Sequence, residues 1–202
     1  MVPAGYMLKK VIERPDSLQA TGVRDIYSLS SCLSENFSDY VKYWKHNGYW
    51  LFNSPATMKE IAAAEGIDLS GMTLFYYEVF PEQFDESSRQ WSAFEVEPSF
   101  LTAVERPASS ELAGYDVTTF SAGNGSECSP LSCNGLAKVL GCNSHCLFLT
   151  FKQAKAALEA GCFDHCEPGP FRIFAVHTVG KRKRSIRPFK QQRRHRSAIS
   201  RH

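Results

Sequence analysis

The chain has 202 residues and a formal net charge of +2, a length that fits one domain of ordinary size or two small ones. Hydrophobic residues make up 43% of it and charged residues 22%, as in soluble globular proteins. No apolar run approaches the roughly 20 residues that span a bilayer, and no apolar segment follows the first lysine pair. These features argue against a membrane span and a signal peptide, so we expect a cytoplasmic protein with no membrane partner.

The predicted elements of residues 1–105 form a small α+β module with an antiparallel sheet. An apolar stripe with helical spacing lies in 36–46. Ser54 and Pro55 begin a second helix, which ends at Gly66. The predicted strands are 7–13, 23–29, 48–52, 72–80 and 91–97, and an acidic loop at 82–88 joins the last two.

Residues 106–114 have the composition of a linker, and a second module follows. Its helix at 151–160 is capped by Thr150 and ended by Gly161. The other elements are a strand at 115–120, a loop at 121–127, a short helix at 130–140 and a strand at 171–179. The expected fold class is α+β: a small antiparallel-sheet module at 1–105, a compact Cys-rich α/β module at 115–180, and a disordered basic tail at 181–202.

The basic tail makes the charge of the chain uneven. Residues 181–202 contain ten of the 23 Lys and Arg residues and none of the 21 acidic residues, so residues 1–180 have a net charge of −8. A polycation of this kind is disordered alone and can bind nucleic acid through phosphates, without sequence preference. It can also fold back onto the acidic body, or remain a solvated extension. The residues that would contact nucleic acid are Lys181, Arg182, Lys183, Arg184, Arg193 and Arg194.

Six of the seven cysteines lie within the forty residues 127–166. They are Cys128, Cys133, Cys142, Cys146, Cys162 and Cys166, and the pattern Cys-x-x-His-Cys occurs at both 142–146 and 162–166. In a reducing compartment, clustered cysteines indicate metal or thiol chemistry before disulfides, and a zinc ion takes four Cys or His ligands. The alternative is that the cysteines are small buried hydrophobic side chains.

A single nucleophilic thiol is a different hypothesis, and Cys133 is its candidate. An Asn-Gly pair and the expected start of a helix follow this residue, so backbone N–H groups there would lower the pKa of its thiol. His145 or His177 would act as the base, oriented by Asn134 or Glu127.

Several runs of the sequence resemble those of a group of uncharacterised bacterial proteins. They are GYWLFNSP at 48–55, LFYYEVF at 74–80, ECSPLSCNG at 127–135, HC at 145–146 and CEPGPFRIFAV at 166–176. The likeness spans 7–179 and implies no activity, but it ranks the cysteines. The site residues within the shared runs are Cys128, Cys133, His145, Cys146 and Cys166, and these form the expected metal site.

The leading hypothesis is therefore a binding or regulatory protein with a Cys/His site that zinc stabilises. One alternative is a cysteine-dependent hydrolase or transferase that uses Cys133 as nucleophile and His145 as base. Another is a protein that associates with nucleic acid through its tail. The sequence leaves open whether the protein is an enzyme.

Overall fold

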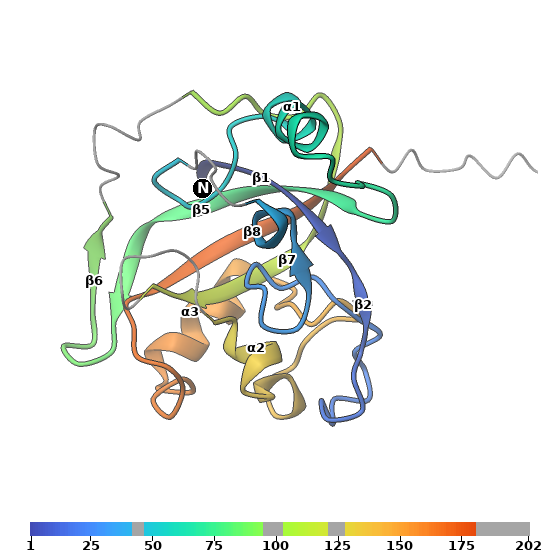
Figure 1. Cartoon of the computed structure of the whole chain (residues 1–202). Coiled ribbons are helices and arrows are strands. Elements are labelled where there is room, and N and C mark those ends of the chain that lie inside the picture. Colours follow the sequence, from blue (N-terminus) through green and yellow to red (C-terminus); the bar gives the residue numbers. More distant parts are fainter. Residues whose placement is uncertain (42–46, 95–102, 121–127, 181–202) are drawn as a thin grey trace, which may run out of the picture.

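The computed structural model describes residues 1–41, 47–94, 103–120 and 128–180, and it is an α+β structure (Figure 1). Antiparallel strands dominate and helices are few, so the expected α+β class is confirmed. No helix in these residues has both the length and the apolar character needed to cross a bilayer. The expected tail at 181–202 lies outside the described residues.

One six-stranded sheet organises the molecule, with the order β4-β1-β5-β8-β7 and with β6 paired to β5. A separate two-stranded sheet contains β2 and β3. The strands are β1 (Val2–Lys10), β2 (Ile12–Glu13), β3 (Asp25–Ile26), β4 (Glu35–Asn36), β5 (Thr73–Asp85), β6 (Gln90–Ala93), β7 (Ser110–Thr119) and β8 (Phe171–Val179). The strand expected at 171–179 is thus confirmed, whereas the one expected at 48–52 is a bend with a single bridge at Phe52.

The helices begin where the expected caps stand. The Ser54 side chain accepts a hydrogen bond from Thr57 N at the start of α1 (Pro55–Glu65), and Gly66 ends this helix with a φ of 68°. Thr150 caps α3 (Phe151–Glu159) in the same way. The helices expected at 36–46 and 130–140 are shorter. The first is a 3₁₀ turn, η1 (Phe37–Tyr40), with 42–46 not described, and the second divides into α2 (Pro130–Cys133) and η3 (Leu136–Lys138).

Strands from both sides of the expected linker share the six-stranded sheet. β5 from the first half pairs with β8 from the second, while β1 and β7 flank this central pair. The last residues of the expected linker already belong to β7. Whether residues 1–105 or 115–180 fold alone stays a prediction, but in the whole chain they build one sheet.

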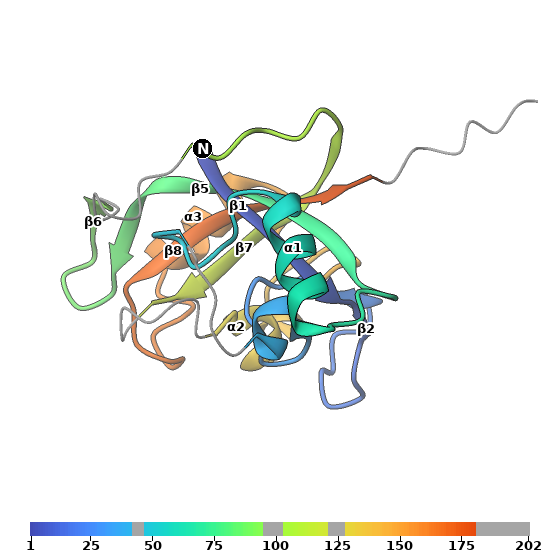
Figure 2. The ribbon, with the colours of Figure 1, turned by 45° about the horizontal axis from the view of Figure 1, so that its top comes forward.

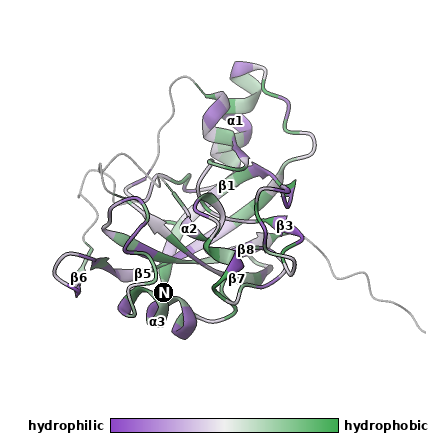
Figure 3. Cartoon of the chain, turned by 90° about the horizontal axis from the view of Figure 1, so that it is seen from below, coloured by the Kyte–Doolittle hydropathy of each residue, from purple (hydrophilic) through white to green (hydrophobic). Residues whose placement is uncertain are grey.

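The two halves repeat one arrangement of strand, loop, helix and strand. β1, α1 and β5 correspond to β7, α3 and β8, and each first strand has a register shift of one residue just before a glycine. These glycines are Gly5 and Gly114, with φ values of 142° and 152°. In Figure 3, α1 and α3 lie on opposite sides of the strands, and in Figure 2 α1 lies beside β1.

A matching loop contacts each of these glycines. The side-chain amide of Asn47 donates to Ala4 O, and that of Asn143 donates to Ala113 O, both at 2.7 Å. A Leu-Phe pair follows each asparagine, and its Phe backbone bridges the tyrosine after the glycine. The two halves are therefore structural repeats that meet at the β5–β8 pair.

The strand registers place three buried polar side chains on one face of the sheet. Lys9 on β1, Tyr77 on β5 and Asp116 on β7 all lie on this face, because directly paired residues share a side. All three are at most 1% exposed. Residues 28–30 hydrogen-bond to Lys9 and Asp116, and they lead into the candidate site.

Candidate metal centre

Three cysteines bring their sulfur atoms together. The Sγ atoms of Cys32, Cys128 and Cys133 all lie within 4.8 Å of one another. Cys32 is exposed, Cys133 is half-buried and Cys128 is only 2% exposed, so this cysteine triad forms a site with one open side. No other group of three or more Cys, His, Asp or Glu side chains is as close within the described ranges.

The triad joins the two repeats. Cys32 lies in the segment between β3 and β4, in the first half of the chain. Cys128 follows β7, where its N–H donates to Thr119 Oγ1 at 3.1 Å and its carbonyl accepts from Thr119 N at 2.9 Å. Cys133 is the last residue of α2, which begins just after Cys128. Backbone hydrogen bonds therefore fix Cys128 and Cys133, whereas Cys32 lies in a bend of the chain.

Lys9 and Asp116 fasten the thiol-bearing segments to the sheet. The Lys9 ammonium donates to the carbonyls of Ser28 and Ser30, just before Cys32. Asp116 Oδ2 accepts from Leu29 N at 2.7 Å and from Ser129 Oγ at 2.6 Å, so one carboxylate links both segments. Asp116 Oδ1 is buried and has no hydrogen-bond partner among the described residues.

Polar groups line the thiols. The Ser30 hydroxyl lies 3.5 Å from Cys133 Sγ, and Cys128 Sγ donates to Asn134 Oδ1 at 3.3 Å. Hydrogen bonds from Cys128 and Cys133 to its thiolate lower the pKa of Cys32 to about 3, and the same sharing of protons raises the pKa of Cys128. One member of the triad is thus readily a thiolate.

The buried charges near the triad are shifted toward their neutral forms. Burial lowers the pKa of Lys9 to about 8, although the negative groups around it oppose this shift. Burial likewise raises the pKa of Asp116 to about 6, against the hydrogen bonds from Ser129 and Leu29.

The structure unites two of the five residues expected at a metal site. Cys128 and Cys133 belong to the triad, and Cys32 is the third member. His145 instead places Nδ1 2.5 Å from Asp25 Oδ1 and stacks on Tyr27 with the ring centroids 4.1 Å apart.

The remaining expected residues pack elsewhere. Cys146 is fully buried in an apolar cluster, and Cys166 packs against the same cluster. The other candidate base, His177, has Nε2 3.8 Å from Glu78 Oε2. Glu127 and the tail residues expected to contact nucleic acid are outside the described part of the chain.

Sequence reasoning missed Cys32 because it lies far from the other cysteines in the chain. The runs Leu-Ser-Ser-Cys at 29–32 and Leu-Ser-Cys at 131–133 are a weak signal that both segments serve one site. The number of residues between the two runs matches no known metal-binding motif, so only the tertiary fold shows that they are close.

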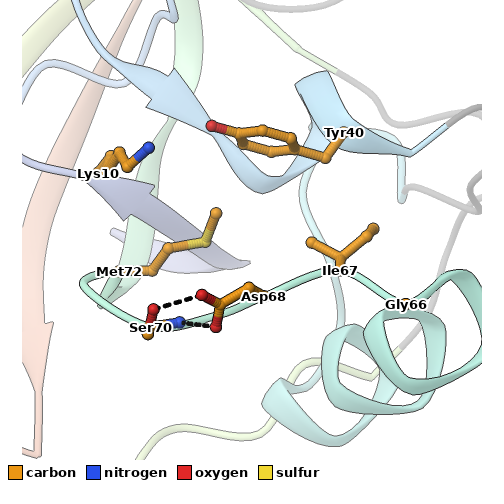
Figure 4. A pocket seen from close by; sticks show the side chains of 7 residues that line it. All are labelled: Lys10, Tyr40, Gly66, Ile67, Asp68, Ser70 and Met72. Atoms are coloured by element: carbon orange, nitrogen blue, oxygen red, sulfur yellow. Dashed lines mark hydrogen bonds between the residues drawn. The ribbon is translucent and has the colours of Figure 1, made fainter.

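Two surface pockets lie outside the triad. The larger, of about 490 Å³, is formed by residues of β1, η1 and the chain after α1 (Figure 4). Asp68 in its floor is already bonded to the Ser70 backbone at 2.8 Å and to its hydroxyl at 2.5 Å. The smaller, of about 240 Å³, lies between 19–23 and 137–142. Neither contains a residue of the triad.

The triad matches the donor set of a thiophilic metal. Zn–S bonds of about 2.3 Å in a tetrahedron place sulfur atoms about 3.8 Å apart, so a small contraction of the observed group would accommodate the ion. Sulfur ligands select zinc, copper(I) and similar ions over magnesium or calcium. Three thiolates leave the fourth position of a tetrahedral ion for another ligand.

Comparisons with known proteins were made at three levels. No family model matches the chain, and neither the curated proteins nor the solved structures contain a match. Functional inference therefore depends on the site itself.

Proposed function

We propose that the chain is a binding or regulatory protein that holds a zinc ion with the thiolates of Cys32, Cys128 and Cys133. The observation that supports this is the mutual approach of three sulfur atoms, within 4.8 Å, from two segments far apart in sequence. A metal would bind all three once they lose their protons.

Glu167 is the candidate for the fourth ligand. It is exposed, its carboxylate interacts with the Cys128 thiol, and its charge also acts on Cys32. Carboxylate oxygen is an accepted zinc ligand at about 2.0–2.2 Å. We expect Glu167→Gln to weaken zinc binding about tenfold, the usual size of effect for an altered metal-site partner. Glu65→Gln, at the exposed end of α1, is the matched control.

Metal analysis of the full chain tests the proposed function. Protein produced in zinc-replete medium without a tag should contain about one zinc per chain. Cys32→Ser should lose that zinc, while Cys162→Ser, which removes an exposed thiol outside the triad, should retain it. Cobalt(II) added to metal-free protein should give a thiolate charge-transfer band with Cys162→Ser and none with Cys32→Ser. Wild-type protein with no zinc and no such band would contradict the proposal.

Thiol chemistry is a second candidate function, and the exposure and low pKa of Cys32 favour it. Near neutral pH Cys32 would be more fully ionised to the thiolate than Cys133, which makes it the better candidate nucleophile. Cys128 lowers the pKa of Cys133, but Cys32 and burial outweigh it and leave the value raised. A hydrolase or transferase would then use Cys32 in place of the predicted Cys133. Metal-free protein in which Cys32 reacts with iodoacetamide at pH 6 far faster than Cys162 would support this function.

Nucleic-acid association through the tail stays a separate proposal. Its support is the concentration of ten basic residues in 181–202. Deletion of 181–202 should abolish DNA binding at low salt, and the binding of the whole chain should weaken steeply as salt is raised.

A further inference from the structure

The least expected charge in the molecule is the ammonium group of Lys9. Its side chain is 1% exposed, and both of its hydrogen bonds go to neutral backbone carbonyls, those of Ser28 and Ser30. None of the ion pairs between described residues includes Lys9. Its neighbour Lys10 is half exposed and pairs with Glu35 in the ordinary way.

A buried ammonium is costly unless a negative group compensates it. The negative groups around Lys9 come from three sides. They are Asp116 on β7, Asp39 on η1 and the thiolate of Cys32, and the Cys133 thiol joins them when it loses its proton. Ser30 links Lys9 to this thiol, because its carbonyl accepts from Lys9 at 3.1 Å and its hydroxyl lies 3.5 Å from Cys133 Sγ. Asp116 acts most strongly on Lys9 among these groups, and the thiols add further negative charge near it once a bound metal has displaced their protons.

We propose that Lys9 is a counter-cation built into the sheet for an anionic metal–thiolate centre at the cysteine triad. The inference rests on the proposed function. Three thiolates and the proposed Glu167 carboxylate around a divalent ion leave a net charge of two negative units, and the Lys9 ammonium offsets one of them. Because the surroundings are buried, this attraction is screened far less than at the surface.

The hydrogen bonds of Lys9 give it a second, positioning role. They fix the carbonyls of Ser28 and Ser30, and thus the path of the chain into Cys32. Lys9 acts through the thiols and does not itself ligate the metal. An experiment must therefore separate its charge from its contribution to the shape of the site.

Zinc affinity of the full chain, measured at pH 8 by competition with a chelator, tests the charge. Lys9→Met should bind zinc at least about tenfold more weakly, since it removes a close opposite charge. Lys9→Arg keeps the charge and should recover most of the affinity. Lys10→Met, which removes the adjacent exposed charge, should bind like the wild type. Equal affinity of Lys9→Met and wild type overturns the inference.

Asp116→Asn supplies a test of opposite sign and does not depend on whether Lys9→Met folds. Asn keeps an oxygen acceptor for Leu29 N and Ser129 Oγ but removes a negative charge near the centre. The counter-cation inference expects tighter zinc binding, several-fold at pH 8, whereas a purely positional role for these clamps expects weaker binding. Weaker or unchanged affinity overturns the inference. If wild-type protein itself binds no zinc, the proposed function fails first, which is a distinct result.

Discussion

At the scale of single residues, the candidate site depends on two ionisable side chains that are buried, Lys9 and Asp116. Asp116 is fully buried, accepts two hydrogen bonds through Oδ2 and leaves Oδ1 without a partner among the described residues. Such a carboxyl fixes geometry at the expense of stability, because its ionised form is poorly solvated. The residues that position the thiols are therefore also the residues that make stability depend on pH.

The pH dependence of Asp116 has a definite sign. Its pKa is raised to about 6 in the folded chain, while in the unfolded chain it has the ordinary value near 3.8. The folded state thus binds more protons between these values, so this carboxyl favours folding below pH 4 and loses that contribution as pH rises through 6. The free energy of unfolding of Asp116→Asn, relative to wild type, should increase by about 3 kcal/mol between pH 4 and pH 8. Urea unfolding at both pH values measures it, and a constant difference would contradict the assignment.

At the scale of elements, features that depend on a few neighbouring residues were predicted better than features that depend on distant parts of the chain. Thr150 and Ser54 could be identified as caps, and the strand at 171–179 from its run of apolar residues, because these patterns are read within a few residues. The stripe at 36–46 predicted a helix, but its described part is a single 3₁₀ turn that contacts β4. The described turn ends at Val41, whose backbone is extended, with a φ of −105° and a ψ of 119°.

The register shift before Gly5 in β1 and before Gly114 in β7 can be tested by substitution of these glycines. At Gly114 an added Cβ would lie 2.7 Å from Phe148 O, and its φ of 152° is unfavourable for any other residue. Gly114→Ala should therefore reduce the free energy of unfolding by about 2–4 kcal/mol. Gly22→Ala is the control, because no atom lies within 4 Å of its added Cβ.

The corresponding substitution in the other repeat extends this test. At Gly5 an added Cβ would meet Leu51 Cβ at 2.7 Å, so Gly5→Ala should be as damaging as Gly114→Ala. Urea midpoints compare all three variants. A loss confined to one repeat would show that the two loops do not have equivalent structural roles.

At the scale of the whole molecule, the cysteine triad takes residues from both repeats, and the sequence indicated only those of the second. The runs Ala-Gly-Tyr at 4–6 and 113–115, with Leu-Phe at 51–52 and 147–148, are visible in the sequence. Cys128 and Cys133 were found because they are close in the chain. Cys32 could not be found, because its approach depends on how β1 and β7 lie in one sheet, with β5 and β8 between them.

Joining the repeats at the cysteine triad has a consequence for stability. Cys32 comes from the first half of the chain and Cys128 and Cys133 from the second, so a bound ion closes the molecule across both. Zinc at about 100 times its dissociation constant should add about 2.7 kcal/mol to the free energy of unfolding. Because β5 and β8 form one sheet, this gain should raise a single unfolding transition, with circular dichroism and tryptophan fluorescence changing together. Cys32→Ser should show one transition that zinc does not move, and Cys162→Ser should respond like wild type. Two transitions, only one of them sensitive to zinc, would instead show that 1–105 and 115–180 unfold as independent modules and that the metal belongs to one of them.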